Sequence, residues 1–365
     1  MFWRLFSVIC LFSCSVVQAA GPSVVAKVNQ ALWQQPINTI EQFDRASRAE
    51  ILLYATELKH LSHLSDAEMK AEFKIKSVDK QSVQTWLAKE QELIIKNYQN
   101  AAKTCQANDW TCVNATQFDE LASQTLTIPA TLSAWQSNTK QFVYHYLAEQ
   151  LRLAALFPNI SSEIMTFNIN EWTGDELPDR QFLLTFDDGP TILDGDTDAT
   201  LAMLQREHKT AIFFVLGQNW RARQNKTHDL VELYQGQCVA LHGYEHQSHA
   251  KWANWQDSII RTKELVTKTN VAFKPLFRPP YGQRKADSGA FFQQHGLQVA
   301  LWNLDSQDWN AKINSDEILN RMLSLILIKR HGVLLFHDVH GKAKTALPEL
   351  FVKLGNAIQW QDCHQ

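Results

Sequence analysis

The sequence predicts a two-part chain, with an all-α region followed by an α/β region built on parallel strands. Up to about residue 157, apolar residues recur at spacings of three and four. From residue 181 they instead form short, nearly continuous runs separated by helical stretches. With 365 residues, 45% of them hydrophobic, the chain is long enough for one large core and one smaller core.

The first stretch of the chain predicts export. Arg4 precedes an apolar segment over residues 5–17 and small residues near Ala19, which is the layout of a signal peptide spanning residues 1–19. The apolar segment is short for a membrane span, which leaves an uncleaved anchor as the alternative. A lipid anchor at Cys14 is disfavoured because bulky Phe12 stands where such signals use small residues. We therefore expect a periplasmic or extracellular protein without stable membrane insertion after cleavage.

The charge of the chain bears on which partners it can bind, and its cysteine content bears on the cell compartment in which it folds. A net charge of -3 without a long Lys/Arg run disfavours nucleic acid as a partner. Four cysteines remain outside the signal, and an even number in an exported chain suggests disulfides. We expect Cys105 to pair with Cys112 across a short polar loop. Cys238 would then pair with Cys363, although a buried free thiol at Cys238 is the alternative.

Residues 20–170 are predicted to be helical. Three stretches, 41–64, 82–105 and 132–157, carry amphipathic spacing, and Pro129 and Pro158 mark boundaries. They predict a small bundle of helices. His60 and His63 are expected to be an exposed pair, since zinc needs at least three protein ligands. The region shows no cluster of catalytic residue types, so its role as a lid, a partner-docking module or a stabilising cap stays open, and its protein partner is unknown.

Residues 171–365 are predicted to form the α/β region, entered through a polar link over 170–180. Continuously apolar runs imply strands covered on both faces, as in a parallel sheet or barrel. In such folds chemistry collects where the C-terminal ends of the strands meet. The apolar runs lie at 181–186, 210–216, 237–241, 297–303 and 332–336, with a short run at 275–277 and helix candidates at 197–208 and 258–269.

Acids, imidazoles and one guanidinium follow these runs. If the strands are neighbours, these side chains face one opening. They are Asp187 and Asp188, His242 and His246, Arg278 in RPPYG, Asp305, Asp308 and Trp309, and His337 with Asp338.

The two histidines and one carboxylate predict a metal site. His242 and His246 are four residues apart, which one helical turn or a tight loop can direct at a common point. Asp187 or Asp188 would complete a three-ligand site with an open position for water. Without the carboxylate, the two histidines would more simply be a surface pair. A metal there would activate water and polarise a carbonyl, which is the means to hydrolyse an amide or an ester.

A water nucleophile also needs a base and the leaving group needs an acid. Neighbouring side chains diverge, so one aspartate would bind the metal and the other would take the proton, held ionised by Arg278. His337 is the candidate acid, and a carboxylate such as Asp305 on its other nitrogen would raise its pKa. The alternatives are an Arg278–Asp305 salt bridge without catalytic function and a core role for His337 and for Trp309.

Five motifs in order, TFDDGP, HGYEH, RPPYG, DSQDW and LLFH, resemble those of the polysaccharide deacetylases of carbohydrate esterase family 4. The resemblance covers residues 181–365, about half the chain. It implies a distorted parallel (β/α) barrel as the catalytic fold, preceded here by the helical region.

The resemblance also implies a role for each residue. Asp187 would be the general base, and Asp188, His242 and His246 would bind one divalent metal ion, usually zinc. His337 would be the general acid.

Five further residues would support this machinery. Arg278 would orient the base, and Asp305 would tune the acid. The backbone N–H of Tyr281 would help to hold the oxyanion, and Trp309 and Leu335 would line the acetyl pocket. One departure is Gly243, which stands where the family has Ser or Thr, so a hydroxyl that braces the metal loop is missing and the metal affinity is in doubt.

The expected function is metal-dependent removal of N-acetyl groups from an N-acetylglucosamine polysaccharide, with peptidoglycan or poly-N-acetylglucosamine favoured. Chitooligosaccharide deacetylation and acetylxylan esterase activity are the alternatives within the same chemistry. A carbohydrate-binding or scaffold protein without activity is the rival from another class, although a binder has no use for two adjacent aspartates at a strand end.

Overall fold

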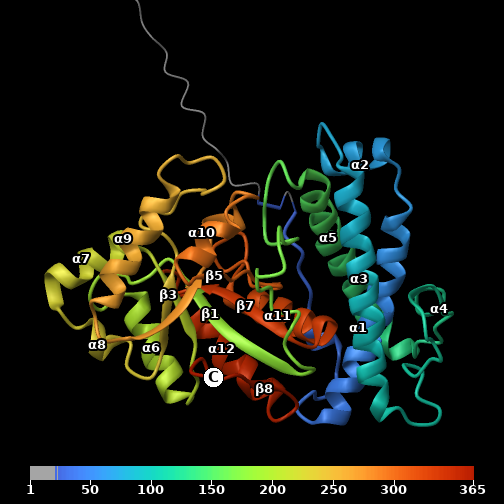
Figure 1. Ribbon diagram of the computed structural model, residues 1–365. Helices are drawn as coiled ribbons and strands as arrows, with labels where there is room; N and C mark the ends of the chain where they lie inside the picture. Colours follow the sequence, from blue (N-terminus) through green and yellow to red (C-terminus); the bar gives the residue numbers. More distant parts are fainter. Residues whose placement is uncertain (1–20, 23) are drawn as a thin grey trace, which may run out of the picture.

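Figure 1 shows a computed structural model of the chain, in which an all-α region stands beside an α/β region. This confirms the predicted fold class. The structure describes residues 21, 22 and 24–365, so the expected signal peptide at 1–19 lies outside the described residues. Within those same residues, no helix combines the length and the apolarity needed to cross a bilayer.

The N-terminal region is built on three long helices, α1, α3 and α5, with short helices between them. Polar side chains cap the helices: the Thr39 hydroxyl accepts from the first turn of α1, and Ser65 with Glu68 forms a capping box on α2. The apolar stripe read from the sequence is buried, with Leu52, Leu53 and Leu58 at most 1% exposed. The elements are η1 (Gln30–Leu32), α1 (Ile40–Ser62), α2 (Asp66–Phe73), α3 (Lys80–Ala101), η2 (Ala102–Thr104), α4 (Phe118–Ala122), η3 (Ala130–Leu132) and α5 (Ser133–Leu156).

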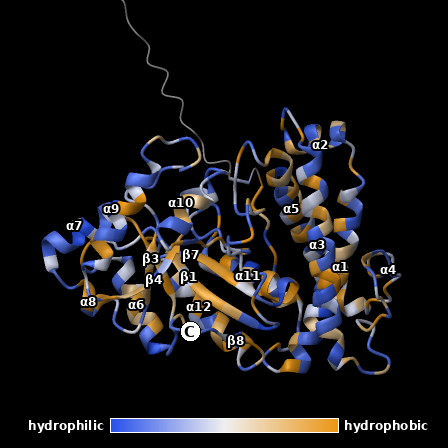
Figure 2. Ribbon diagram, viewed as in Figure 1, coloured by the Kyte–Doolittle hydropathy of each residue, from blue (hydrophilic) through white to orange (hydrophobic). Residues whose placement is uncertain are grey.

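The second region contains a parallel sheet in the order β5-β4-β3-β2-β1-β7-β6, with β8 paired to the start of β1. Figure 2 shows β1 and β7 as hydrophobic along their length, in agreement with strands covered on both faces. The strands are β1 (Gln181–Asp187), β2 (Ile212–Val215), β3 (Cys238–Leu241), β4 (Ala272–Phe277), β5 (Gln298–Val299), β6 (Leu304–Asp305), β7 (Gly332–His337) and β8 (Gln359–Trp360).

The sheet curls into an open barrel, and the connection from β5 to β6 requires this. These strands are consecutive in the chain but lie at opposite edges of the sheet. Five residue steps from Val299 to Leu304 cover at most about 18 Å. Seven strands side by side in a flat sheet would instead place the edges about 29 Å apart. The apolar run 297–303 was expected to be one strand, but only Gln298–Val299 forms β5. The rest of the run crosses from one edge of the sheet to the other, and Ala300 in it pairs with Trp172 of the polar link over 170–180.

Helices connect the strands and cover the outside of the barrel (Figure 1). The predicted helices 197–208 and 258–269 correspond to α6 and α9. The elements are α6 (Asp196–Arg206), α7 (Gly217–Thr227), α8 (Leu230–Leu233), α9 (Trp255–Thr267), η4 (Pro280–Gly282), α10 (Gly289–Gln294), α11 (Ser315–Lys329) and α12 (Ala343–Leu354).

The helical region docks on α11 through buried polar contacts. The Ser47 hydroxyl donates to the Leu327 carbonyl at 2.6 Å, and the Asn97 amide donates to the Lys329 carbonyl at 2.9 Å. Arg330, which is fully buried, forms an ion pair with Asp44 of α1 at 2.8 Å. Removing one partner of such a buried pair typically costs about 3–5 kcal/mol, so the two regions are joined by specific contacts.

Both expected disulfides are present. Cys105 and Cys112 close the loop after α3, and Cys238 of β3 is bonded to Cys363 near the C-terminus. The second bond excludes the free-thiol alternative for Cys238. It spans 125 residues and joins the end of the chain to the centre of the sheet. Disulfides of this kind typically stabilise a fold by about 2–4 kcal/mol.

Candidate active site

The strand ends bring the predicted residues together. β1 ends at Asp187, β7 ends at His337, and His242 and Arg278 follow β3 and β4 directly. Because these strands are parallel neighbours, their C-terminal ends open on one side of the barrel. The residues line a common cavity of about 310 Å³, except for Arg278, which is fully buried behind it.

Asp188, His242 and His246 form a cluster suited to a divalent metal. Nε2 of His242 lies 3.3 Å and Nε2 of His246 lies 3.4 Å from Oδ1 of Asp188, and the three ligand atoms fall within 4.8 Å of one another. His242 donates from Nδ1 to the Arg278 carbonyl at 2.7 Å, which leaves Nε2 to face the cluster.

The burial and charge of the same cluster fit a divalent cation. Oδ1 of Asp188 is buried without a hydrogen-bond partner. Burial would raise the pKa of Asp188, but the adjacent His242 and the positive charge of His337 outweigh it and lower that pKa. Burial lowers the pKa of His246 to about 4, so this imidazole is neutral and keeps a lone pair. One carboxylate and two imidazoles fit zinc or a similar divalent ion.

Asp187 lies between this cluster and Arg278, with Oδ2 3.8 Å from Nε2 of His242. Oδ1 of Asp187 accepts a 2.8 Å hydrogen bond from Nη1 of Arg278, and the aspartate is only 2% exposed. The guanidinium is itself held by Thr185 and by the carbonyls of Ala300 and Leu301. Burial lowers the pKa of Arg278 against the raising effect of Asp187. The alternative salt bridge from Arg278 to Asp305 is therefore not formed.

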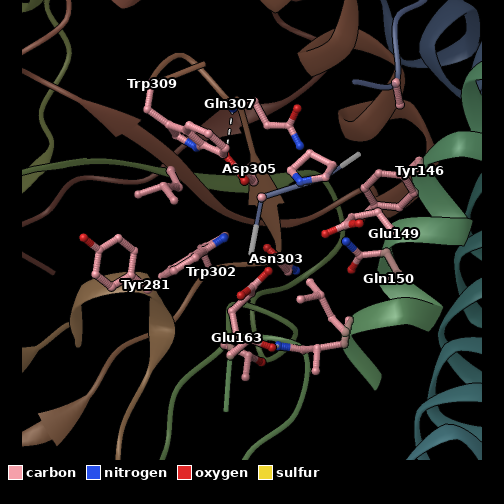
Figure 3. Close-up of a pocket in the computed structure, with 18 of the residues that line it drawn as sticks. Tyr146, Glu149, Gln150, Glu163, Tyr281, Trp302, Asn303, Asp305, Gln307 and Trp309 are labelled. Carbon is pink, nitrogen blue, oxygen red and sulfur yellow. Dashed lines mark hydrogen bonds between the residues drawn. The ribbon is translucent and has the colours of Figure 1, made fainter. Parts of the chain in front are cut away.

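The carboxylate on His337 is Asp308, which corrects the expected pairing with Asp305. Nδ1 of His337 donates to Oδ1 of Asp308 at 2.7 Å, and the His337 backbone N–H donates to Oδ2 at 2.9 Å. The strand register explains the difference, because β6 pairs Asp305 with Leu335, two residues short of His337. Asp305 instead accepts from the Gln307 backbone N–H at 2.7 Å, drawn as a dashed line in Figure 3.

Asp308 also changes the titration of His337. Burial would lower the pKa of His337, but the charge of Asp308 and its hydrogen bond outweigh burial and raise that pKa to about 10. The imidazole is therefore protonated near neutral pH, with Nε2–H left to donate. Asp308 follows the same apolar run as Asp305, so only the register distinguishes the two acids.

The three expected substrate-binding residues also line the cavity. Tyr281 adopts a left-handed conformation with φ of 60° and its ring lies 4.5 Å from that of His246. Trp309 is 39% exposed, whereas Leu335 is 4% exposed. An apolar floor beside half-exposed aromatic rings is an arrangement that fits a small acyl group on a sugar.

Gly243 is required by the local packing. Its φ is +88°, and a Cβ there would meet Cε1 of His249 at 2.9 Å and Oγ of Ser258 at 3.1 Å. Ser258 on α9 accepts from the Tyr244 backbone N–H at 2.7 Å. The hydroxyl that the sequence lacks at 243 is thus supplied from a neighbouring helix, and nothing in the local sequence pointed to it.

The cavity also reaches residues that the sequence did not single out. Figure 3 shows Tyr146, Glu149 and Gln150 of α5 on the opposite side of the cavity from Tyr281. Glu163, from the segment after α5, lines it as well. The helical region showed no catalytic pattern because its lining residues become neighbours of the site only when the two regions dock.

Comparisons with known proteins find polysaccharide deacetylases that are similar to part of this chain. The family model described as "Polysaccharide deacetylase" matches residues 174–300. Chitin deacetylase 1 of Saccharomyces cerevisiae is 31% identical over 182 residues, covering 48% of this chain and 56% of that protein. A peptidoglycan-N-acetylglucosamine deacetylase of Bacillus cereus is 29% identical over 143 residues, covering 38% of this chain and 50% of that protein. The crystal structure of a peptidoglycan N-acetylglucosamine deacetylase superposes with a TM-score of 0.45 at 24% identity, covering 53% of this chain and 90% of that one.

The family match carries only part of the site, because it ends at residue 300, before Asp308, Trp309, Leu335 and His337. The chain spans about half the length of these two curated relatives. The family match begins after the helical region and includes Asp187, Asp188, His242, His246 and Arg278. Over these residues the chain is similar to the polysaccharide deacetylase family.

Proposed function

We propose that this protein is a metal-dependent hydrolase that removes N-acetyl groups from an N-acetylglucosamine-containing polysaccharide. The observation that carries the proposal is the convergence of a three-ligand cluster, a carboxylate oriented by arginine and a protonated histidine on one cavity. Each of these groups has a place in amide hydrolysis, and a binding protein needs none of them in this combination.

Asp188, His242 and His246 would hold the metal, most simply zinc. When bound, a divalent ion supplies a Lewis acid that polarises the acetyl carbonyl and makes water more acidic. Asp187 receives the proton of the attacking water, and Arg278 holds its carboxylate in place.

The remaining groups act on the substrate. The Tyr281 backbone N–H stabilises the developing oxyanion, and Trp309 with Leu335 surrounds the acetyl methyl group. His337 gives its proton from Nε2 to the departing nitrogen, and Asp308 stabilises the imidazolium until then. The C–N bond of the amide breaks, a C–O bond to the water oxygen forms, and acetate and a free amine leave.

We favour peptidoglycan or poly-N-acetylglucosamine as the polymer and a periplasmic or extracellular location. Relatives of the chain are named peptidoglycan deacetylases in Bacillus cereus and Bacillus subtilis. Peptidoglycan lies outside the cytoplasmic membrane, and two disulfides suit an oxidising compartment. The relatives also include a chitin deacetylase and a xylan deacetylase, so chitin oligomers and acetylxylan belong in the substrate screen.

The test is acetate release by the purified protein from peptidoglycan, poly-N-acetylglucosamine, chitin oligomers and acetylxylan. We expect release from an N-acetylated polymer that stops with a chelator and returns when zinc is added. An Asp187→Asn variant serves as the matched control for contaminating activity. No chelator-sensitive acetate from any of the four polymers would contradict the proposal in favour of a binding protein.

A further inference from the structure

The catalytic cavity continues past the strand ends to the helical region. Its lining passes from His337 and Asp188 to side chains of α3 and α5 and to residues 160–164. In Figure 3, Glu149 and Gln150 of α5 border one side of this extension, and Glu163 lies at its lower end. The end of the cavity away from the cluster is therefore built by the part of the chain that precedes the family match.

This extension is acidic. Besides Asp187 and Asp188 at the catalytic end, five of the side chains lining the cavity are carboxylic acids, and three are lysine or arginine. Lys89 is paired with Asp175 at 2.7 Å, and Lys329 with Glu90. The third, Arg321, donates to main-chain carbonyls. An excess of negative charge thus faces the interior of the cavity.

Glu163, like Asp305, lines the cavity without an ion pair to another described residue. Among the described residues, no Lys, Arg or His nitrogen lies within 4.0 Å of its carboxylate. Glu149, by comparison, is bound by Arg152 through both oxygens. Burial, helped by the carboxylates of Asp305 and Glu149, raises the pKa of Glu163 to about 7, against the lowering effects of its own backbone N–H and of Arg284. A ligand carrying positive charge would relieve this repulsion.

Two buried polar groups on the same cavity also lack partners. Gln307 is 5% exposed, has φ of 57°, and its Oε1 accepts no hydrogen bond. Trp302 is 8% exposed and its Nε1–H has no acceptor. Buried polar groups are nearly always paired, and an unpaired one costs about 1–3 kcal/mol. The pair therefore points to a ligand that donates to Gln307 and accepts from Trp302.

An amino sugar meets both requirements. A primary ammonium has three donors and a positive charge, which suits carboxylates and an amide oxygen. The sugar hydroxyls accept as well as donate, which suits the indole N–H of Trp302. Deacetylation itself produces this unit, because the amide nitrogen leaves as an amine.

We propose that the helical region completes a subsite for a glucosamine unit already deacetylated, so that the enzyme acts on acetylated units near one that carries a free ammonium. Glu163 is the charged group of this subsite, and Gln307 and Trp302 are its neutral groups. The inference rests on the proposed function and specifies its substrate as a partly deacetylated chain.

The experiment compares kcat/KM for fully acetylated chitotetraose with that for tetramers carrying one glucosamine at each position in turn. For the unaltered protein we expect at least one glucosamine-bearing tetramer to be preferred roughly tenfold, as expected of a charge-assisted hydrogen bond. In Glu163→Gln this preference ratio should fall by about tenfold. Glu92→Gln, at an exposed acid of α3 away from the cavity, should keep the ratio.

The outcomes separate the two proposals. Acetate released at equal rates from all tetramers by the unaltered protein, or a preference unchanged in Glu163→Gln, would overturn the subsite while leaving the deacetylase function standing. No acetate from any tetramer, with none from the polymers, would overturn both. If Glu163→Gln fails to fold, the kcat/KM values of the unaltered protein for acetylated and glucosamine-bearing tetramers still test the subsite.

Discussion

Asp187 and Asp188 are adjacent carboxylates with different surroundings. Asp188 has φ of +80°, so the backbone turns sharply after β1 and the two side chains diverge. One faces the histidine cluster and the other faces Arg278. Each carboxylate therefore has its own positively charged or metal-binding neighbour, which offsets the repulsion between two like charges at the end of a buried strand.

This separation predicts different failures for two variants. Asp187→Asn should lose at least about a hundredfold in kcat, because it removes the base but none of the proposed ligands. His242→Ala should lose the metal itself. Metal content after dialysis, together with acetate release, measures both effects. Equal loss of metal in the two variants would show that Asp187 is a ligand.

The His337–Asp308 pair predicts a shift in the pH profile. Asp308 stabilises the protonated imidazole, so removing its charge lowers the pKa of His337 from about 10. A general acid works only while protonated, so the alkaline limb of the kcat profile should move to lower pH in Asp308→Asn. Asp305→Asn should move that limb less, because Asp305 does not contact the imidazole. A larger shift in Asp305→Asn would restore Asp305 as the tuning residue.

At the scale of elements, α9 supports the loop after β3. Ser258, 1% exposed, accepts from the Tyr244 backbone N–H, between the two histidines of the cluster. This contact compensates for Gly243, whose backbone conformation and packing leave no room for a side chain. The loop geometry thus depends on a helix that follows it in the chain.

We therefore expect Ser258→Ala to weaken zinc binding roughly tenfold, as is typical when a group supporting the ligands is removed. Competition with a chromophoric chelator measures the affinity. Ser288→Ala, at a buried serine near α10, is the control and should bind zinc normally. Equal affinities in both variants would mean that the loop holds its shape without Ser258.

At the scale of the whole molecule, Glu50 lies in the contact between the helical region and α11. It is 1% exposed, and its Oε1 accepts from Gln30 at 2.5 Å and from Ser324 at 3.3 Å. Oε2 has no partner. Burial raises the pKa of Glu50 to about 7 against the lowering effect of these hydrogen bonds. The docked state therefore favours the neutral acid.

Stability should accordingly fall as the pH rises from the unfolded pKa near 4.5 to about 7, since the folded chain then holds a proton that the unfolded chain releases. Above that range the loss is complete, at about 3 kcal/mol. Glu50→Gln should remove this pH dependence of stability. The urea midpoint of Glu50→Gln, relative to that of the unaltered protein, should therefore be higher at pH 8 than at pH 5. Glu92→Gln is the surface control. A constant difference between Glu50→Gln and the unaltered protein at both pH values would contradict this prediction.

The sequence by itself determined the fold class, the Cys105–Cys112 disulfide and the set of strand-end residues that meet at one site, whereas the Cys238–Cys363 bond was decided by the structure. These depend on hydrophobic periodicity and on residues placed directly after strands, which are local properties. Only the tertiary structure decided that Asp308 and not Asp305 binds His337, because the β6–β7 register is a relation between two strands. The same holds for Ser258 behind Gly243 and for Glu163 in the cavity, since each reaches the site through packing between segments that are distant in the chain.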